Sequence, residues 1–190
     1  MRRCGYLSVR SALCTGLLLI ATAFSVCCSN QPRPNQAPST QPAAKTGTLT
    51  GRVVRIADGD TVTMLDSTNT QHRIRLQGID APELSQAFGA QSKQNLSVMI
   101  FDRDVSAVCD KTDQYGRLVC KIVFDDKDIN LEQVKAGMAW HYKEYEREQT
   151  PEDRELYARA EDEARNAHCG LWVDTNPIEP SEFRREERSR

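Results

Sequence analysis

The chain has 190 residues, with 25 basic and 27 acidic groups and a formal net charge of −2 at pH 7. This length allows one domain of ordinary size with flanking segments. Nucleic-acid-binding domains are often basic, so the negative balance argues against strong nonspecific DNA binding through overall charge. Any affinity for a polyanion must come from a local patch or from a bound cation.

Residues 1–28 have the pattern of a secretory signal. Three arginines come first, and residues 13–26 are largely apolar. This pattern predicts export. Cys27 or Cys28 stands where bacterial lipoproteins carry their lipid, so membrane attachment through one of them is the alternative to release. We therefore expect a periplasmic, cell-envelope-anchored or secreted protein.

Residues 29–46 consist mainly of Asn, Gln, Pro, Ser, Thr and Ala, with almost no large apolar side chain. Such a segment cannot bury a core, which predicts a disordered linker. Without the first 28 residues, 22 basic and 27 acidic groups remain, for a net charge of about −5. A folded region is expected at 47–175. A charged flexible tail is expected at 176–190, where Arg184 is one of several arginines offset by glutamates.

The folded region predicts strands first and helices later. Apolar alternation and turn signals indicate five strands, at 48–56, 62–65, 72–76, 105–109 and 118–124. Helices are expected at 87–100, 130–136 and 151–167. Asn130 can cap the second helix and Gly137 can end it. Hairpin-like connections, with helices after the third and fifth strands, favour an α+β, mainly β fold: a small Greek-key barrel.

Three of the seven cysteines lie in the region expected to fold, Cys109, Cys120 and Cys169. No pair has the CxxC spacing of a zinc site. Cys109 and Cys120 flank the turn at 111–117 symmetrically. Two interpretations stay open: a disulfide across a hairpin in an oxidising compartment, or two small half-buried side chains in strands.

Four carboxylates and an arginine lie in two short polar segments, at 58–61 and 75–83. Because the stretch between the segments predicts a β-hairpin, both can return to one end of the sheet. Hard oxygen ligands suit Ca²⁺ or Mg²⁺, and a guanidinium beside them suits a phosphate. The combination predicts phosphodiester chemistry at a metal site.

These segments resemble the signature of the staphylococcal nuclease, or thermonuclease, family. DGDTV at 58–62, RL at 75–76 and IDAPE at 79–83 match that signature at every defined position. A second family signature, an Asp-basic-Tyr-Gly-Arg turn, is met at 113–117, except that Gln114 replaces the basic residue. The resemblance covers about residues 47–172 and implies a five-stranded OB-fold Greek-key barrel with three helices.

The resemblance also implies roles for individual residues. The implied Ca²⁺ ligands are Asp60, Asp80 and the backbone carbonyl of Ala81. The implied catalytic residues are Glu83 as general base, and Arg75 and Arg117, which would bind the scissile phosphate and stabilise charge in the transition state. The candidate substrate-binding residues are Tyr115, Tyr142, Lys143 and Tyr145.

The implied function is a calcium-dependent phosphodiesterase, an endonuclease that hydrolyses DNA and RNA with low sequence specificity and leaves 3′-phosphate ends. No obligate protein partner is indicated. One alternative is a non-catalytic OB-fold module that binds nucleic acid or protein. Such modules usually lose acids or arginines of the site, and none is missing here. Another is an envelope protein that binds Ca²⁺ only for stability, which leaves Arg75 and Arg117 without a role.

Overall fold

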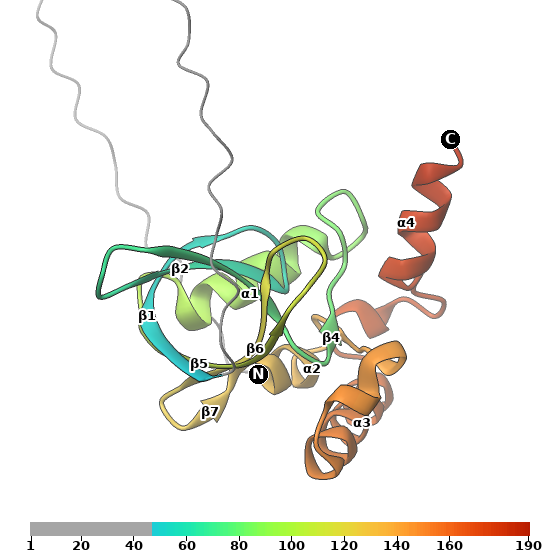
Figure 1. The fold of residues 1–190 in the computed structure, drawn as a ribbon. Helices are drawn as coiled ribbons and strands as arrows, with labels where there is room; N and C mark the ends of the chain where they lie inside the picture. Colours follow the sequence, from blue (N-terminus) through green and yellow to red (C-terminus); the bar gives the residue numbers. More distant parts are fainter. Residues whose placement is uncertain (1–46) are drawn as a thin grey trace, which may run out of the picture. The chain divides into compact units, whose positions relative to one another are not determined.

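A computed structural model describes residues 47–190, and the predicted export signal at 1–28 and linker at 29–46 lie outside them. The strands are β1 (Gly47–Ile56), β2 (Thr61–Asp66), β3 (Gln71–Leu76), β4 (Ile79–Asp80), β5 (Asp104–Thr112), β6 (Leu118–Phe124), β7 (Lys127–Asp128) and β8 (Trp140–His141). The α-helices are α1 (Gly89–Ile100), α2 (Ile129–Lys135), α3 (Pro151–Asn166) and α4 (Pro180–Arg188), with 3₁₀ helices at Lys143–Glu148 and Gly170–Val173 (Figure 1).

Five strands form a closed barrel. Their order is β3-β2-β1-β5-β6, each neighbouring pair is antiparallel, and a parallel pairing of β3 with β6 closes the ring (Figure 1). The short β7 continues the sheet beyond β6, and β4 pairs with β8 in a separate ribbon. The predicted α+β fold with a five-stranded barrel is therefore confirmed.

The core fills the barrel and extends under α1 and α2. Alternate residues of each strand point inward, which is why Val62, Met64 and Ile74 are fully buried. Helix α1 adds Leu96 and Ile100 from one face. A second apolar cluster beside α3 contains Trp140 and Trp172, whose rings meet edge to face with centroids 5.3 Å apart. The barrel core and this second cluster together support the loops at the end of the barrel.

Of the two residues expected to cap and end helix α2, one is confirmed and one is wrong. Gly137 follows its end with φ +64°, the left-handed conformation expected there. Its N-cap is Asp128, whose Oδ1 accepts from Leu131 N at 3.1 Å, and not Asn130. Asn130 is instead fully buried inside the first turn and binds backbone groups of the barrel.

The two cysteines that flank the β5–β6 turn form a disulfide. Cys109 and Cys120 are register partners across the two strands, with S–S 2.08 Å. This decides between the two interpretations left open by the sequence. Cys169 is free and exposed. None of the helices between residues 47 and 190 is long and apolar enough to cross a membrane.

The C-terminal segment differs from the flexible tail predicted for 176–190. Residues 180–188 form α4, which begins with Pro180 at its first turn, a position that helices accept because no intrahelical partner is lost (Figure 1). Pro180 is buried, and Gln86 Nε2 donates to the Ile178 carbonyl at 2.6 Å just before the helix. These contacts anchor the start of α4 beside the barrel.

Candidate active site

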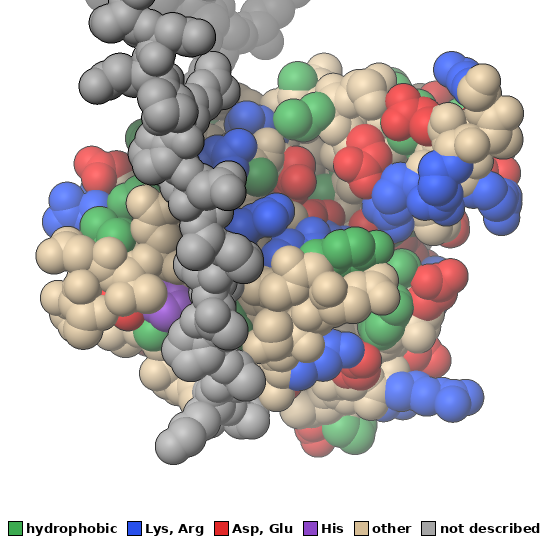
Figure 2. All heavy atoms as spheres, turned by 45° about the horizontal axis from the view of Figure 1, so that its top comes forward, with side chains coloured by type: hydrophobic (Ala, Val, Ile, Leu, Met, Phe, Trp, Pro, Cys, Tyr) green, Lys and Arg blue, Asp and Glu red, His purple; other side chains and the backbone are tan. Residues whose placement is uncertain are grey.

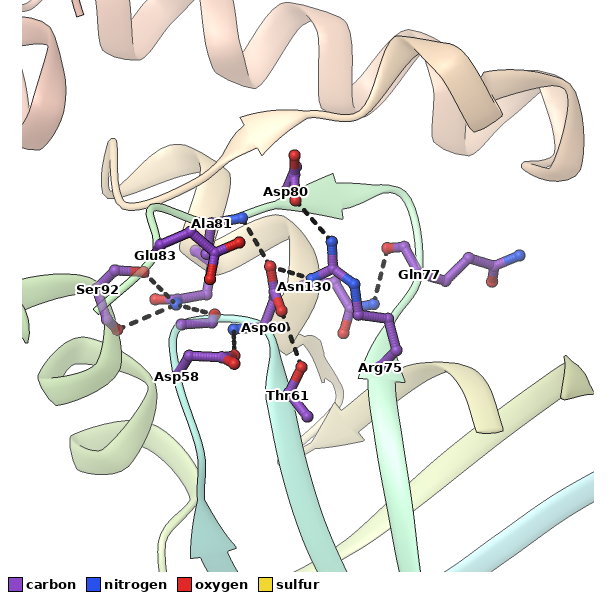
Figure 3. Close-up of polar contacts among 12 residues, drawn as sticks. Asp58, Asp60, Thr61, Arg75, Gln77, Asp80, Ala81, Glu83, Ser92 and Asn130 are labelled. Carbon is purple, nitrogen blue, oxygen red and sulfur yellow. Dashed lines mark hydrogen bonds and ion pairs between the residues drawn. The ribbon is translucent and has the colours of Figure 1, made fainter. Parts of the chain in front are cut away.

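The two predicted carboxylate segments meet at one end of the barrel, where the loop before β2 faces the connection between β3 and β4 (Figure 3). Leu76 N donates to the Asp60 carbonyl at 2.8 Å, and Ala81 N donates to Asp60 Oδ2 at 2.7 Å. Asp60 and Asp80 are both buried. The hairpin prediction, that both segments face each other, is confirmed.

Gly59 fixes the path of the first segment. Gln133 Nε2 donates to its carbonyl at 2.7 Å, and Ser92 Oγ lies so close that a Cβ on Gly59 would stand 1.9 Å from it. Ser92 itself is held because its Oγ donates to the Met138 carbonyl at 2.6 Å. Helices α1 and α2 therefore position the loop that carries Asp58 and Asp60.

Arg75 bridges the two acidic segments from the end of β3. Its Nη2 donates to Asp80 Oδ1 at 2.8 Å, and its Nη1 forms an ion pair with Asp60 Oδ2 without the geometry of a hydrogen bond (Figure 3). Only 13% of the Arg75 side chain is exposed. Burial lowers the pKa of Arg75, and the nearby charge of Asp80 opposes that shift. The guanidinium therefore stays paired with carboxylates in a poorly hydrated position.

Arg117 enters the same region from the β5–β6 turn. Asp113 organises this turn: its Oδ1 accepts from Tyr115 N and Arg117 N, each at 2.9 Å, and its Oδ2 accepts from Arg117 Nε at 2.7 Å. Arg117 Nη1 reaches Thr61 Oγ1 at 3.5 Å. The Nε bond fixes one edge of the guanidinium, so the opposite edge is oriented for another partner.

Three aromatic side chains surround this arrangement. The Tyr115 ring is exposed, with the Arg117 Cζ 5.4 Å from its centre. Tyr142 and Tyr145 lie with ring centroids 5.0 Å apart. Burial and a hydrogen bond to Glu144 raise the pKa of Tyr142.

Lys143 turns away from the aromatic group. Its Nζ donates to the buried carboxylate of Glu161 at 2.9 Å, and it does not line the cavity. His141 is buried, with its Nε2 2.8 Å from Gln149 Oε1. Both residues thus stabilise the support behind the site.

A cavity of about 650 Å³ joins these groups. Its lining contains nearly all of the predicted site residues: Asp60, Arg75, Ala81, Glu83, Tyr115, Arg117, Tyr142 and Tyr145. Asp80 lies behind them, between two arginines. Figure 2 shows a face of the molecule on which basic and acidic side chains lie next to each other, with a group of basic side chains at its right edge. The site is therefore mixed in charge, not a uniform basic patch.

Asp58 and Arg184 are among the lining residues to which sequence reasoning assigned no role. Asp58 belongs to the recognised motif, and its Oδ1 accepts from Asp60 N at 3.0 Å. Arg184 was expected in a solvated tail. Its guanidinium instead binds Asp80 and Glu83. Burial acts to lower the pKa of Arg184, but these hydrogen bonds outweigh it and raise the pKa above the ordinary value. Nothing local in the sequence distinguishes Arg184 from Arg185.

The residues present fit a hard divalent cation. Among the residues the structure describes, no three His, Cys, Asp or Glu side chains form a metal cluster on their own. Asp60 and Asp80 nevertheless supply converging carboxylates, and Ca²⁺ completes its shell with carbonyls and water. The backbone amide of Ala81, and not its carbonyl, contacts Asp60. Metal binding by the Ala81 carbonyl therefore stays a prediction.

Comparisons with known proteins agree with this geometry. The family model described as "Staphylococcal nuclease homologue" matches residues 73–174. An "Uncharacterized endonuclease" of Haemophilus influenzae is 40% identical over 179 residues, which cover 94% of this chain and 88% of the relative. "Protein ParB" of Escherichia coli is 39% identical, covering 75% of this chain and 82% of its own.

A third relative carries a more specific name. "Micrococcal nuclease" of Shigella flexneri is 39% identical over 144 residues, 71% of this chain and 80% of the relative. The family match covers more than half of the chain, and its fold is the barrel described above. Taken with the arrangement of acids and arginines, these matches support a nuclease function, and the chain belongs to the staphylococcal nuclease family.

Proposed function

We propose that this protein is a calcium-dependent endonuclease that hydrolyses phosphodiester bonds of DNA and RNA and leaves 3′-phosphate ends. One observation carries the proposal: three acids and two arginines from separate segments converge around one cavity. Asp60, Glu83, Arg75 and Arg117 line the cavity, and Asp80 is paired with Arg75 next to it. Turn or strand formation alone would not require all five, whereas diester hydrolysis has a use for each.

Glu83 supports the role of general base. Its side chain is 36% exposed at the cavity, so water can reach the carboxylate. In the proposed step the water oxygen bonds to phosphorus while Glu83 accepts the water proton. The bond from phosphorus to the 5′ oxygen breaks, and that oxygen leaves as an alcohol after taking a proton from solvent. Positioned base catalysis of this kind contributes on the order of a hundredfold or more.

Arg75 and Arg117 would bind the phosphate as negative charge grows on it. A planar guanidinium can donate two parallel hydrogen bonds to phosphate oxygens, which an ammonium cannot. Asp113 holds the Nε of Arg117 and thus orients its outer edge. Ca²⁺ bound by Asp60 and Asp80 would supply further positive charge beside the diester.

The remaining lining explains low sequence specificity. Tyr115 and Tyr145 are exposed aromatic side chains, and Lys111 Nζ lies 5.2 Å from the centre of the Tyr145 ring. Every base offers a face for stacking, and phosphate contacts carry no base information. A site built from rings and cations therefore suits single strands of either DNA or RNA. Gln114 stands in the turn without the charge of the family's usual basic residue.

The proposed location is outside the cytoplasm. The basic start, the apolar stretch and the following cysteines at 27 and 28 support export, with release or lipid attachment as its two forms. The test is to separate periplasm, membranes and culture medium and to measure how the wild type and a Cys27→Ser/Cys28→Ser variant distribute among them. Location in the cytoplasm would refute export, and identical fractionation of both proteins would refute the anchor.

Calcium-dependent cleavage is the direct test of the function. Purified protein should cleave single-stranded and plasmid DNA with Ca²⁺, and a chelator should stop it. Phosphatase should change the mobility of the products by removing a 3′-phosphate. Glu83→Gln should lower the rate about a hundredfold, whereas Glu163→Gln, on the exposed side of α3, should leave it unchanged. Tight DNA binding without turnover, or full activity of Glu83→Gln, would overturn the proposal.

A further inference from the structure

Helix α4 brings one arginine back to the acids of the site. Arg184 Nη1 donates to Glu83 Oε1 at 2.8 Å, and Arg184 Nη2 donates to Asp80 Oδ2 at 2.9 Å. A third contact joins Nη1 to Asp80 Oδ1 at 3.3 Å. The partners lie 101 and 104 residues earlier in the chain. One guanidinium thus binds two carboxylates that come from the barrel end.

These are the two acids that the proposed function needs unoccupied. Asp80 would be a metal ligand and Glu83 the base, but here one arginine forms ion pairs with both. The guanidinium lies against Glu83 Oε1 and Asp80 Oδ2, the carboxylate oxygens that an attacking water or a cation would have to approach. The Arg184 contact therefore opposes both metal binding and base catalysis.

We propose that α4 is a built-in inhibitor: without metal, Arg184 occupies the cation position beside Asp80 and holds Glu83, and it must leave before Ca²⁺ and substrate bind. The inference rests on the proposed function of the site. Arg184 differs from Arg75, which is buried at the end of β3 and cannot leave without disturbing the barrel. Of the two arginines bound to Asp80, Arg184 on the terminal helix is therefore the one that Ca²⁺ would replace.

The anchoring of α4 suits reversible release. Within the helix only Pro180 is buried, and 32% of the Arg184 side chain is exposed. A nine-residue helix is marginal on its own, so α4 gains its order from few contacts. Partly exposed ion pairs are weakened by salt and contribute little stability. We call the form in which Arg184 binds Asp80 and Glu83 the closed form. It is held mainly by these Arg184 contacts and by the short segment before the helix.

A third phosphate-binding arginine is the competing role for Arg184. In that role its removal would weaken cleavage and leave metal affinity unchanged. The geometry favours inhibition, because both terminal nitrogens are used on the two acids and point at carboxylate oxygens. For removal of the Arg184 side chain, the inhibitory role therefore predicts tighter Ca²⁺ binding, and the phosphate-binding role predicts unchanged Ca²⁺ binding.

Calcium affinity separates these roles. Isothermal titration of Ca²⁺ into the full-length chain and its Arg184→Ala variant should give a Kd about tenfold lower for the variant, as expected when a tenfold excess of closed form is removed. Arg185→Ala is the matched control, since Arg185 is exposed and, within residues 47–190, pairs only with Glu182 on its own helix. Its Kd should equal that of the wild type.

A second measurement follows α4 itself. Hydrogen exchange of the peptide at 179–190 should speed up when Ca²⁺ is added to the wild type, and should already be fast in Arg184→Ala. If the wild type binds Ca²⁺ and cleaves DNA but Arg184→Ala has the same or a higher Kd, the inhibitor is overturned and the proposed function stands. If neither protein binds Ca²⁺ or cleaves DNA, the proposed function falls, and the inhibitor falls with it.

Discussion

Asn130→Ala should destabilise the protein because Asn130 joins three parts of the fold. Its Oδ1 accepts from Ile122 N at 3.1 Å, and its Nδ2 donates to the Cys120 carbonyl at 3.1 Å. The Nδ2 also donates to the Gln77 carbonyl at 3.0 Å (Figure 3). The residue is fully buried, so water cannot replace these bonds. The Cys120 carbonyl keeps a second donor, Gln77 N at 2.9 Å.

The substitution therefore leaves two backbone groups short of a partner, the buried Ile122 amide and the half-buried Gln77 carbonyl. Each such loss costs about 1–3 kcal/mol, which predicts a decrease of about 3 kcal/mol in the free energy of unfolding. Urea denaturation of the oxidised protein, followed by circular dichroism, measures this difference. Lys135→Ala, whose side chain pairs only with Glu132 on the same helix, should change stability by less than about 0.5 kcal/mol. A loss below about 1 kcal/mol for Asn130→Ala would refute the reasoning.

Two further changes test the supports of the site. Gly59→Ala places a Cβ against Ser92, so the segment carrying Asp60 must shift. We expect the free energy of unfolding to fall by about 1–3 kcal/mol and the cleavage rate to fall at least tenfold. Unchanged kinetics would contradict this. Burial acts to raise the pKa of Asp113, but its bonds to the turn, the backbone bond from Arg117 foremost, lower it below the ordinary 3.8. Because the folded-state pKa is depressed, this stabilisation is present above about pH 4 and lost as pH falls further. The Tm difference between wild type and Asp113→Asn, about 3 °C at pH 6, should shrink at pH 3, and a constant difference would argue against it.

The local parts of the fold could be predicted from the sequence. Each strand carries alternating apolar residues, and hairpin turns separate neighbours, so β2 and β3 follow from their own residues. Gly137 ends α2 as expected because only a residue tolerant of positive φ fits there. The acids and Arg75 could be placed together because a hairpin returns its ends to one edge. These features depend on contacts close in sequence.

Contacts distant in sequence could not be predicted in the same way. Asn130 has the chemistry of a cap, but Asp128 takes that position. The side-chain amide of Asn130 instead binds the backbone of Ile122 in β6 and of Gln77, which lies 53 residues earlier in the turn after β3. Lys143 sits beside two tyrosines in sequence, yet the buried charge of Glu161 attracts it away from the cavity. In both cases a buried group needed a partner, and that need appears only once the chain has folded.

The charges around Asp80 explain why a terminal arginine could be selected as its partner. Arg117 is paired with Asp113, so Asp60, Asp80 and Glu83 contribute three negative charges against the single positive charge of Arg75. The excess of two equals the charge of one calcium ion, whereas Arg184 cancels only half of it. Exchange of Arg184 for a divalent cation therefore improves the electrostatic balance of the buried carboxylates, while no monovalent ion offers the same gain. Under the proposed exchange, the site would be stable with Arg184 bound and would still favour calcium over its own arginine.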